Sequence, residues 1–312
     1  MTTAVEKPRL ALHNILFTTD FSDASHRALP FATAFARRYN AHLVIANVIE
    51  QIPMTPVPMD AMPPDIQRDE ELAERQMQKF LGHDDLQGVA FETVVEPGFL
   101  WPVVEDTVNK RKIDLIVLGT HGRGALKRFL LGSSAEEIFR HAACPVLTVG
   151  PHVGPELAHK DRLDKILFAT DFSSGSMLAL DYALTLTQEH DAQLLMIHVV
   201  QASAIPFDIT DEFVADAEAK LAKMIPRDRM PSTTPLFLTL IGIPSEQVLN
   251  FAQREDADLI VIGMHRGTDL APHWPNEFAA KVIAGAKCPV LSMLGGEPLR
   301  YLHRPVDPTS IP

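Results

Sequence analysis

Asn14-Ile-Leu-Phe-Thr-Thr-Asp-Phe-Ser22 returns later in the chain as Lys165-Ile-Leu-Phe-Ala-Thr-Asp-Phe-Ser173. Each copy is a short apolar run that ends in polar residues, which is the pattern of a buried parallel strand. The offset between the two copies is 151 residues. A period of this length is too long for a solenoid repeat, so the stretch indicates two homologous domains in one chain.

Three further stretches repeat. Ala41–Val48 returns at the same offset of 151, whereas Ile113–Gly119 and Cys144–Leu147 return at an offset of 144. Seven residues are therefore missing from the second copy between its second and fourth elements. These offsets predict domains at 1–150 and 162–294, a linker at 151–161 that contains Pro151, Gly154 and Pro155, and a proline-rich tail at 295–312.

Strand and helix patterns alternate along each copy. In the first copy we predict strands at 15–18, 43–49, 90–95, 115–118 and 146–149, and helices at 24–40, 68–81, 100–110 and 134–141. This alternation is typical of right-handed βαβ units, so the fold class is α/β with two tandem, doubly wound, parallel five-stranded sheets. A proline-rich segment at 51–67 also carries Met54, Met59 and Met62, and it is either a lid over a ligand or partner surface, or simple packing.

Composition excludes several classes of protein. The 312 residues carry a formal charge of −12, which disfavours binding to nucleic acid and to anionic membrane surfaces. Two cysteines cannot form a disulfide framework, and the 13 histidines show no metal-ligand spacing. The N-terminus has no secretory signal pattern and no apolar run could span a membrane, so we expect a cytoplasmic protein.

Polar and glycine-rich residues follow the predicted first and fourth strands. Thr18, Thr19 and Asp20 come after the first, and Gly119-Thr-His-Gly122-Arg123-Gly124 begins at the end of the fourth. Ligands of doubly wound sheets bind beyond the carboxyl ends of the strands, where the strand order reverses. In the usual order 3-2-1-4-5 these two loops would flank one crevice.

Gly132-Ser133-Ser134 opens the next helix, and Lys127 and Arg128 precede it. Glycine lets backbone N–H groups approach an anion, and a helix N-terminus favours phosphate. The alternative for this segment is a plain turn with a capping box between Ser133 and Glu136. Because both glycine elements occur at strand carboxyl ends, we favour an anion site, although neither a P-loop nor a complete dinucleotide fingerprint is present.

The pattern Gly119-x2-Gly122-x9-Gly132-Ser133 resembles the ATP-binding signature of the universal stress protein family. The Thr-Asp-Phe-Ser strand end and the Cys-Pro-Val-Leu strand strengthen the resemblance, which covers nearly the whole chain as a tandem form. It implies a sheet of order 3-2-1-4-5, similar to the adenine nucleotide alpha hydrolases, and, in one branch of the family, ATP binding. The resemblance also implies that the two halves pair like a dimer through their fifth strands, at Val146–Val149 and Val290–Met293.

The resemblance assigns roles to residues of the first half. Thr19 and Asp20 would border the adenine and ribose, and Val48 would contact adenine through its backbone. The ribose and phosphates would be held by Gly119, Gly122, Gly132, Ser133 and Ser134, with Thr18 and Arg123 completing the candidate site. ATP is thus the expected ligand, with Asp20 a candidate Mg²⁺ contact.

The second half departs from this pattern. The positions of Gly122, Gly132, Ser133 and Ser134 are taken by Arg266, Asn276, Glu277 and Phe278. A carboxylate at a phosphate position is repulsive, costing on the order of 4 kcal/mol at ~4 Å and an effective dielectric of ~20. We therefore predict one nucleotide site per chain, in the first half.

Other candidate residues receive simpler interpretations. His121 and His265 in the glycine loops are more simply positioning or packing residues than catalysts, and Cys144 and Cys288 are small buried residues. Ser22 and Ser173 are expected helix N-caps, and the charged run at 68–74 a solvated helix face.

Three functions are compatible with these features. The first is an ATP-binding stress-response regulatory protein that acts on an unidentified protein partner and has at most slow ATPase activity. The second is an interaction module of the same family that binds no nucleotide. The third, an enzyme acting on adenylated intermediates, is disfavoured because its motifs are missing. The sequence does not decide between a single chain and a homodimer.

Overall fold

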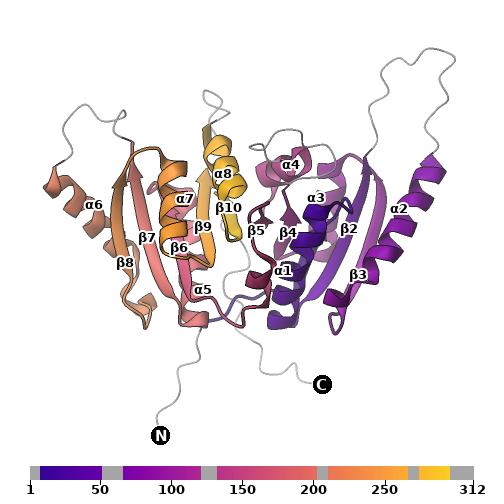
Figure 1. The fold of residues 1–312 in the computed structure, drawn as a ribbon, viewed down its shortest axis with the longest axis horizontal. Helices are drawn as coiled ribbons and strands as arrows, with labels where there is room; N and C mark the ends of the chain where they lie inside the picture. The colour runs from indigo at the N-terminus through magenta and orange to yellow at the C-terminus, as the bar shows by residue number, and fades with distance from the viewer. Residues whose placement is uncertain (1–7, 51–65, 121–131, 202–209, 266–273, 296–312) are drawn as a thin grey trace, which may run out of the picture.

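A computed structural model of the 312-residue chain describes residues 8–50, 66–120, 132–201, 210–265 and 274–295. Within these ranges one continuous sheet crosses the molecule in the order β3-β2-β1-β4-β5-β10-β9-β6-β7-β8 (Figure 1). The strands of the first half are β1 (Asn14–Thr18), β2 (His42–Glu50), β3 (Phe91–Gly98), β4 (Leu115–Gly119) and β5 (Val146–Val149). Those of the second half are β6 (Lys165–Thr170), β7 (Gln193–Val200), β8 (Leu236–Ile241), β9 (Leu259–His265) and β10 (Val290–Gly295). Each half has the predicted order 3-2-1-4-5.

Helices cover both faces of the sheet. They are α1 (Asp23–Tyr39), α2 (Ile66–Leu81), α3 (Leu100–Arg111), α4 (Ser133–His141), α5 (Ser174–His190), α6 (Asp211–Met224), α7 (Pro244–Arg254) and α8 (Trp274–Gly285). One apolar core lies between the sheet and α1, α2, α5 and α6, and a second lies under α3, α4, α7 and α8. Successive strand residues alternate between the cores: Ile15 and Phe17 face the first, and Leu16 faces the second. The inner strands, such as β1, β4, β5 and β6, are buried on both faces, which explains their continuous apolar runs.

The helix N-caps of α1 and α5 confirm the prediction for the two serines. The Ser22 side chain accepts a hydrogen bond from the Ser25 N–H, and Ser173 accepts one from the Ser176 N–H. Predicted element ends differ from the observed ones by at most three residues; for example, the strand expected at 90–95 runs from Phe91 to Gly98. The proline-rich segment lies almost entirely outside the described residues, and so do the tail beyond Gly295 and His121.

The two halves join through their fifth strands, as the resemblance implied. β5 and β10 are antiparallel, whereas every other strand pair in the described sheet is parallel. Leu147 lies opposite Leu291, and the buried Ser292 hydroxyl donates to the Val146 carbonyl over 3.2 Å. The pairing removes two sheet edges that would otherwise be open to another chain.

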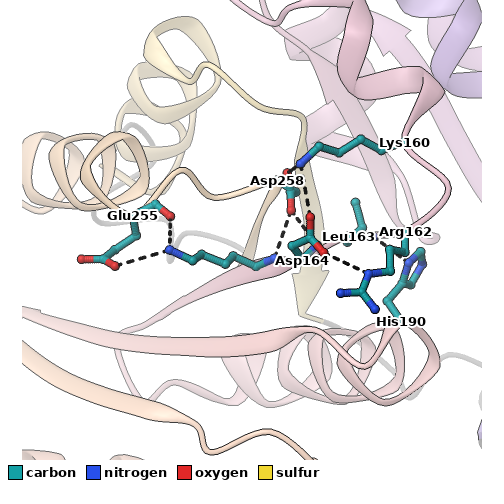
Figure 2. Close-up of polar contacts among 8 residues, drawn as sticks. Lys160, Arg162, Leu163, Asp164, His190, Glu255 and Asp258 are labelled. Atoms are coloured by element: carbon teal, nitrogen blue, oxygen red, sulfur yellow. Dashed lines mark hydrogen bonds and ion pairs between the residues drawn. The ribbon is translucent and has the colours of Figure 1, made fainter.

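The linker between the halves contacts both of them, and Figure 2 shows polar contacts of its end with the second half. A short 3₁₀ helix, η2 (Pro155–His159), places Ala158 in the core. Beyond it, Lys160 Nζ lies 2.6 Å from Asp258 Oδ1, and the Leu163 N–H donates to His190 Nδ1 over 2.8 Å. The segment that the sequence marks as a break between domains is thus part of their contact.

Candidate nucleotide site

A cavity of about 580 Å³ opens at the carboxyl ends of the first-half strands. It lies between β1 and β4, where the order 3-2-1-4-5 reverses, and the N-terminus of α4 forms one wall. Its lining contains eight of the ten residues that the sequence proposed: Thr18, Thr19, Asp20, Val48, Gly119, Gly132, Ser133 and Ser134. Gly122 and Arg123 lie outside the described residues.

The turn from β1 into α1 fixes the Asp20 carboxylate in this cavity. Phe21 has a positive φ of 60°, which turns the chain sharply after Asp20. Asp20 Oδ1 accepts from the Ser25 hydroxyl over 2.6 Å and from the Ser22 N–H over 3.0 Å. Burial alone would raise the pKa of Asp20, but these hydrogen bonds outweigh it and the pKa lies below its usual value. The group is therefore an anion at neutral pH.

Asn47 supports the same turn from the neighbouring strand. Its buried side-chain amide donates to the Thr19 carbonyl over 2.8 Å, and the Thr19 N–H donates to the Ala46 carbonyl over 2.8 Å. These two bonds continue the β1–β2 pairing beyond the last strand residue. These bonds consequently hold Thr18, Thr19 and Asp20 in a fixed position at the carboxyl end of β1.

Gly119 has a structural reason to be glycine. A Cβ at this position would overlap the carbonyl oxygen of Ala24, because β4 runs directly beneath the first turn of α1. Gly263 in the second half stands in the same relation to the Gly175 carbonyl. The first glycine of the signature is thus required by strand–helix packing in both halves, independently of any ligand.

The N-terminus of α4 has no side-chain cap. Gly132 is its N-cap, so Ser133 is the first helical residue and the alternative of a capping box at Ser133 is wrong. The Gly132 N–H donates to the Thr120 carbonyl over 2.8 Å, which ties the start of α4 to the end of β4. Ser134 Oγ reaches across to Glu50 Oε1 at 3.4 Å. Both serine side chains are exposed at the rim of the cavity.

One wall of the cavity was not predicted from the sequence. Asp69, Leu72, Ala73 and Gln76 of α2 line it. Their spacing of three, one and three residues is that of a single helix face, a signal that the charged run at 68–74 concealed. Leu72 is 49% exposed and adds apolar surface to this wall.

The charge of the described lining is negative. Three carboxylates, those of Asp20, Glu50 and Asp69, line the cavity, and the described lining contains no lysine or arginine. Any phosphate that enters would need a cation beside it. The described residues contain no group of three or more histidine, cysteine or acidic side chains arranged for a metal ion.

Comparison with known proteins identifies the family of this chain. The model of the universal stress protein family matches residues 11–150 and 162–292, which together make up most of the sequence. The chain belongs to the universal stress protein family.

Individual relatives agree with this assignment. A universal stress protein of Mycobacterium tuberculosis is 25% identical over 302 residues, covering 92% of this chain and 98% of the relative. One of Methanocaldococcus jannaschii is 30% identical over 138 residues, covering 43% of this chain and 80% of the relative. The solved structure of a universal stress protein from Archaeoglobus fulgidus superposes with a TM-score of 0.68 at 21% identity, covering 91% of this chain and 98% of that one. The tandem arrangement is therefore shared over the full length with other members.

The second universal stress protein domain keeps the turn but changes its surroundings. Asp171 Oδ1 accepts from the Ser176 hydroxyl over 2.7 Å, just as Asp20 accepts from Ser25. At the position of Asn47, however, stands His198, whose ring lies 4.4 Å from the ring of Phe172. Lys220 Nζ lies 3.9 Å from the centre of the same Phe172 ring. The side chains of His198, Phe172 and Lys220 thus form a contact cluster beside the turn of the second domain.

The opening turn of α8 also differs from that of α4. Glu277 and Phe278 stand where the first domain has Ser133 and Ser134. Glu277 is exposed and pairs with Lys281 over 2.7 Å, and Phe278 packs against the core beneath α8. Neither side chain offers a hydroxyl donor.

Both cysteines are buried, as predicted. Cys144 and Cys288 are buried ahead of β5 and β10, and burial raises the pKa of each thiol to about 12. No helix in the described part of the chain combines the length and the apolar character needed to cross a membrane.

Proposed function

We propose that this universal stress protein binds one ATP per chain, in the first domain, and acts as a regulatory protein rather than as a dedicated enzyme. The observation that carries the proposal is that eight of the ten residues predicted from the sequence line one cavity. Its volume of about 580 Å³ lies in the range of about 300–1,000 Å³ that is typical of small-molecule sites.

The lining of the cavity combines the two kinds of chemistry that a nucleotide requires. Val48 and Leu72 offer apolar surface for a base, and the Asp20 carboxylate can accept hydrogen bonds from a ribose. The uncapped N-terminus of α4, with Ser133 and Ser134, offers N–H and hydroxyl donors to a phosphate. Bound ATP would thus contact β1, β2 and α4 together.

The negative lining favours ATP accompanied by Mg²⁺. Asp20, Glu50 and Asp69 would repel a bare triphosphate, and a divalent cation would reduce this repulsion. Arg123, Lys127 and Arg128 of the sequence are further candidate partners of the phosphates, although they lie outside the described residues.

Binding by the first domain alone is supported by the differences between the halves. In the second domain His198 replaces Asn47 of the cavity lining, and the His198 ring and the Lys220 ammonium both contact the Phe172 ring. Glu277 brings a carboxylate to the position of Ser133, where a phosphate would be repelled.

The test is mass spectrometry of nucleotide released from the purified, denatured protein, followed by calorimetry of ATP with Mg²⁺ on the emptied chain. We expect a stoichiometry of one. Ser133→Glu, which copies the second domain, should abolish binding, whereas the exposed control Glu277→Ser should leave it unchanged. Two ATP per chain would contradict binding by one domain, and an absence of binding would favour an interaction module that takes no nucleotide.

A further inference from the structure

Two residues at the same position of the two repeats contact each other. Arg38 and Glu189 are separated by 151 residues, the offset that relates the first half to the second. Arg38 Nε lies 3.0 Å from Glu189 Oε1. Equivalent positions can meet only on the approximate twofold axis between the halves, where Leu147 and Leu291 also lie opposite each other.

The contact is an ion pair that is largely shielded from solvent, and its two side chains differ in exposure. The Glu189 side chain is 4% exposed, and that of Arg38 is 29% exposed. Glu189 Oε2 also accepts from the Tyr39 hydroxyl over 2.9 Å and from the Leu10 N–H over 3.5 Å, and Arg9 lies 3.8 Å from Oε1. All of these donors come from the first half. Burial and the Glu189 charge raise the pKa of Tyr39, which keeps its hydroxyl a donor.

The second half does not return these contacts. Its counterpart of Tyr39 is His190, whose Nδ1 accepts instead from the N–H of Leu163, just ahead of β6. Arg38 donates in addition to the Asp161 carbonyl over 3.0 Å. The axis of the molecule is therefore lined by a positive residue from one half and a negative residue from the other.

We propose that the Arg38–Glu189 pair makes this interface select the pairing of a first half with a second half over the pairing of two like halves. If two first halves paired through β5, Arg38 would face Arg38. If two second halves paired through β10, the buried Glu189 would face Glu189 without the donors from Tyr39 and Leu10. Both like-with-like arrangements bring equal charges together where little solvent screens them.

The partner that this surface fits is therefore a second half with an acidic residue at the axis. The central contact of the sheet junction gives no such selectivity, because Leu147 and Leu291 are the same residue type. The ionic pair supplies a difference in charge that β5 and β10 lack.

The test uses the full chain with the two charges reversed singly and together. We expect Arg38→Glu and Glu189→Arg each to lower the urea midpoint of unfolding and to produce more multi-chain species than the unmodified protein, as measured by light scattering after refolding. The double exchange, Arg38→Glu with Glu189→Arg, should recover part of both losses. The rest stays lost because Arg38 also contacts the Asp161 carbonyl and because an arginine at position 189 offers no acceptor to Tyr39 and Leu10. Lys79→Glu and Glu74→Arg on the exposed part of α2 are the matched charge controls and should change neither quantity.

A mixing experiment tests selectivity directly. Chains with Arg38→Glu and chains with Glu189→Arg, one of them labelled with heavy nitrogen, are unfolded together and refolded. Native mass spectrometry should then show two-chain species that contain one chain of each kind in excess of the statistical share. Single reversals that behave like the unmodified protein would overturn the proposal. So would a double exchange no better than the singles, since the site would then need these residue shapes rather than opposite charges. If the single reversals do not fold, the milder Glu189→Gln and the double exchange still decide the question.

Discussion

Asp114 and Asp258 each accept two backbone N–H groups at the start of the first strand of their half. Among the described residues, a lysine pairs with Asp258 and not with Asp114. Asp114 Oδ2 accepts the N–H groups of His13 and Asn14 at 2.7 and 2.9 Å, just where β1 begins. Asp258 Oδ2 accepts those of Asp164 and Lys165 at 2.6 and 3.0 Å ahead of β6, while its Oδ1 accepts from Lys160 at 2.6 Å (Figure 2). Each carboxylate thus anchors the central strand of its half.

Replacing these carboxylates should therefore destabilise the two halves to different extents. Asp114→Ala leaves two backbone donors without their acceptor, and we expect a loss of about 2 kcal/mol. Asp258→Ala also leaves the Lys160 ammonium without its closest partner, and we expect about 3 kcal/mol. Urea unfolding measures both. Lys160→Met is the control, since a partly exposed ion pair contributes only about 1 kcal/mol or less. A larger loss for Lys160→Met than for Asp258→Ala would show that the lysine, rather than the strand anchor, dominates.

Replacing Gly119 should lower the stability of the fold, whether or not a ligand is bound. Because a Cβ at Gly119 or Gly263 overlaps helix backbone, Gly119→Ala and Gly263→Ala should each cost about 2–3 kcal/mol. Thermal unfolding of both variants checks this. Gly82→Ala, where the nearest backbone atom lies at 3.3 Å, should cost less than about 1 kcal/mol. If Gly119→Ala were as stable as the unmodified protein, the close approach of β4 to α1 would be wrong.

Much of the fold could be predicted from the sequence because the same order of strand and helix patterns occurs twice in the chain. The buried runs at 14–18 and 165–170 have no other favourable environment than the middle of a parallel sheet, and the repeat offsets fix the order of elements. The joining of β5 to β10 was predicted from the resemblance alone, since an edge strand does not reveal in its own residues which partner it will pair with. The antiparallel direction of that pairing was not predicted.

The candidate site was only partly predictable. Residues that follow β1 and β4 were found because their polarity interrupts apolar strands. The wall formed by α2 was missed because Asp69, Leu72 and Gln76 are separated in the sequence from those loops and meet them only after the chain has folded. The contact between Arg38 and Glu189 was equally hidden, because the sequence shows that their positions correspond but not that they touch.

Asp20 offers a probe of the proposed ligand that leaves the turn intact. In Asp20→Asn the side-chain oxygen can still accept from Ser22 and Ser25, so the loop should keep its shape while the charge is lost. We expect the affinity for ATP with Mg²⁺ to fall about tenfold, equivalent to about 1.4 kcal/mol, and the advantage of Mg²⁺ over its absence to shrink. Calorimetry with and without Mg²⁺ measures both effects.

Asp171→Asn is the matched control for Asp20→Asn. Asp171 occupies the same turn, and its pKa is likewise held below the usual value by hydrogen bonds from Ser173 and Ser176 that outweigh its burial. Since the second domain is proposed to bind no ATP, this variant should bind like the unmodified protein. Equal losses in the two variants would argue for a shared effect on stability and against a ligand contact by Asp20.

His190 should make the stability of the molecule fall in mild acid. His190 is 8% exposed, and its Nδ1 accepts from the Leu163 N–H. Burial, reinforced by the nearby Arg38 and Arg162, lowers the pKa of this ring from 6.5 to about 4. The opposite effect of Asp258 is smaller. Because the folded chain resists protonation of this ring while the unfolded chain accepts it, the stabilisation is complete above pH 6.5 and is lost as the pH falls towards 4. The loss attributable to His190 is about 2 kcal/mol between pH 7 and pH 5. Urea unfolding at these two pH values should show a smaller difference for His190→Gln, whose side-chain oxygen can accept from Leu163 but takes up no proton. The same pH dependence in both proteins would place its origin in other groups.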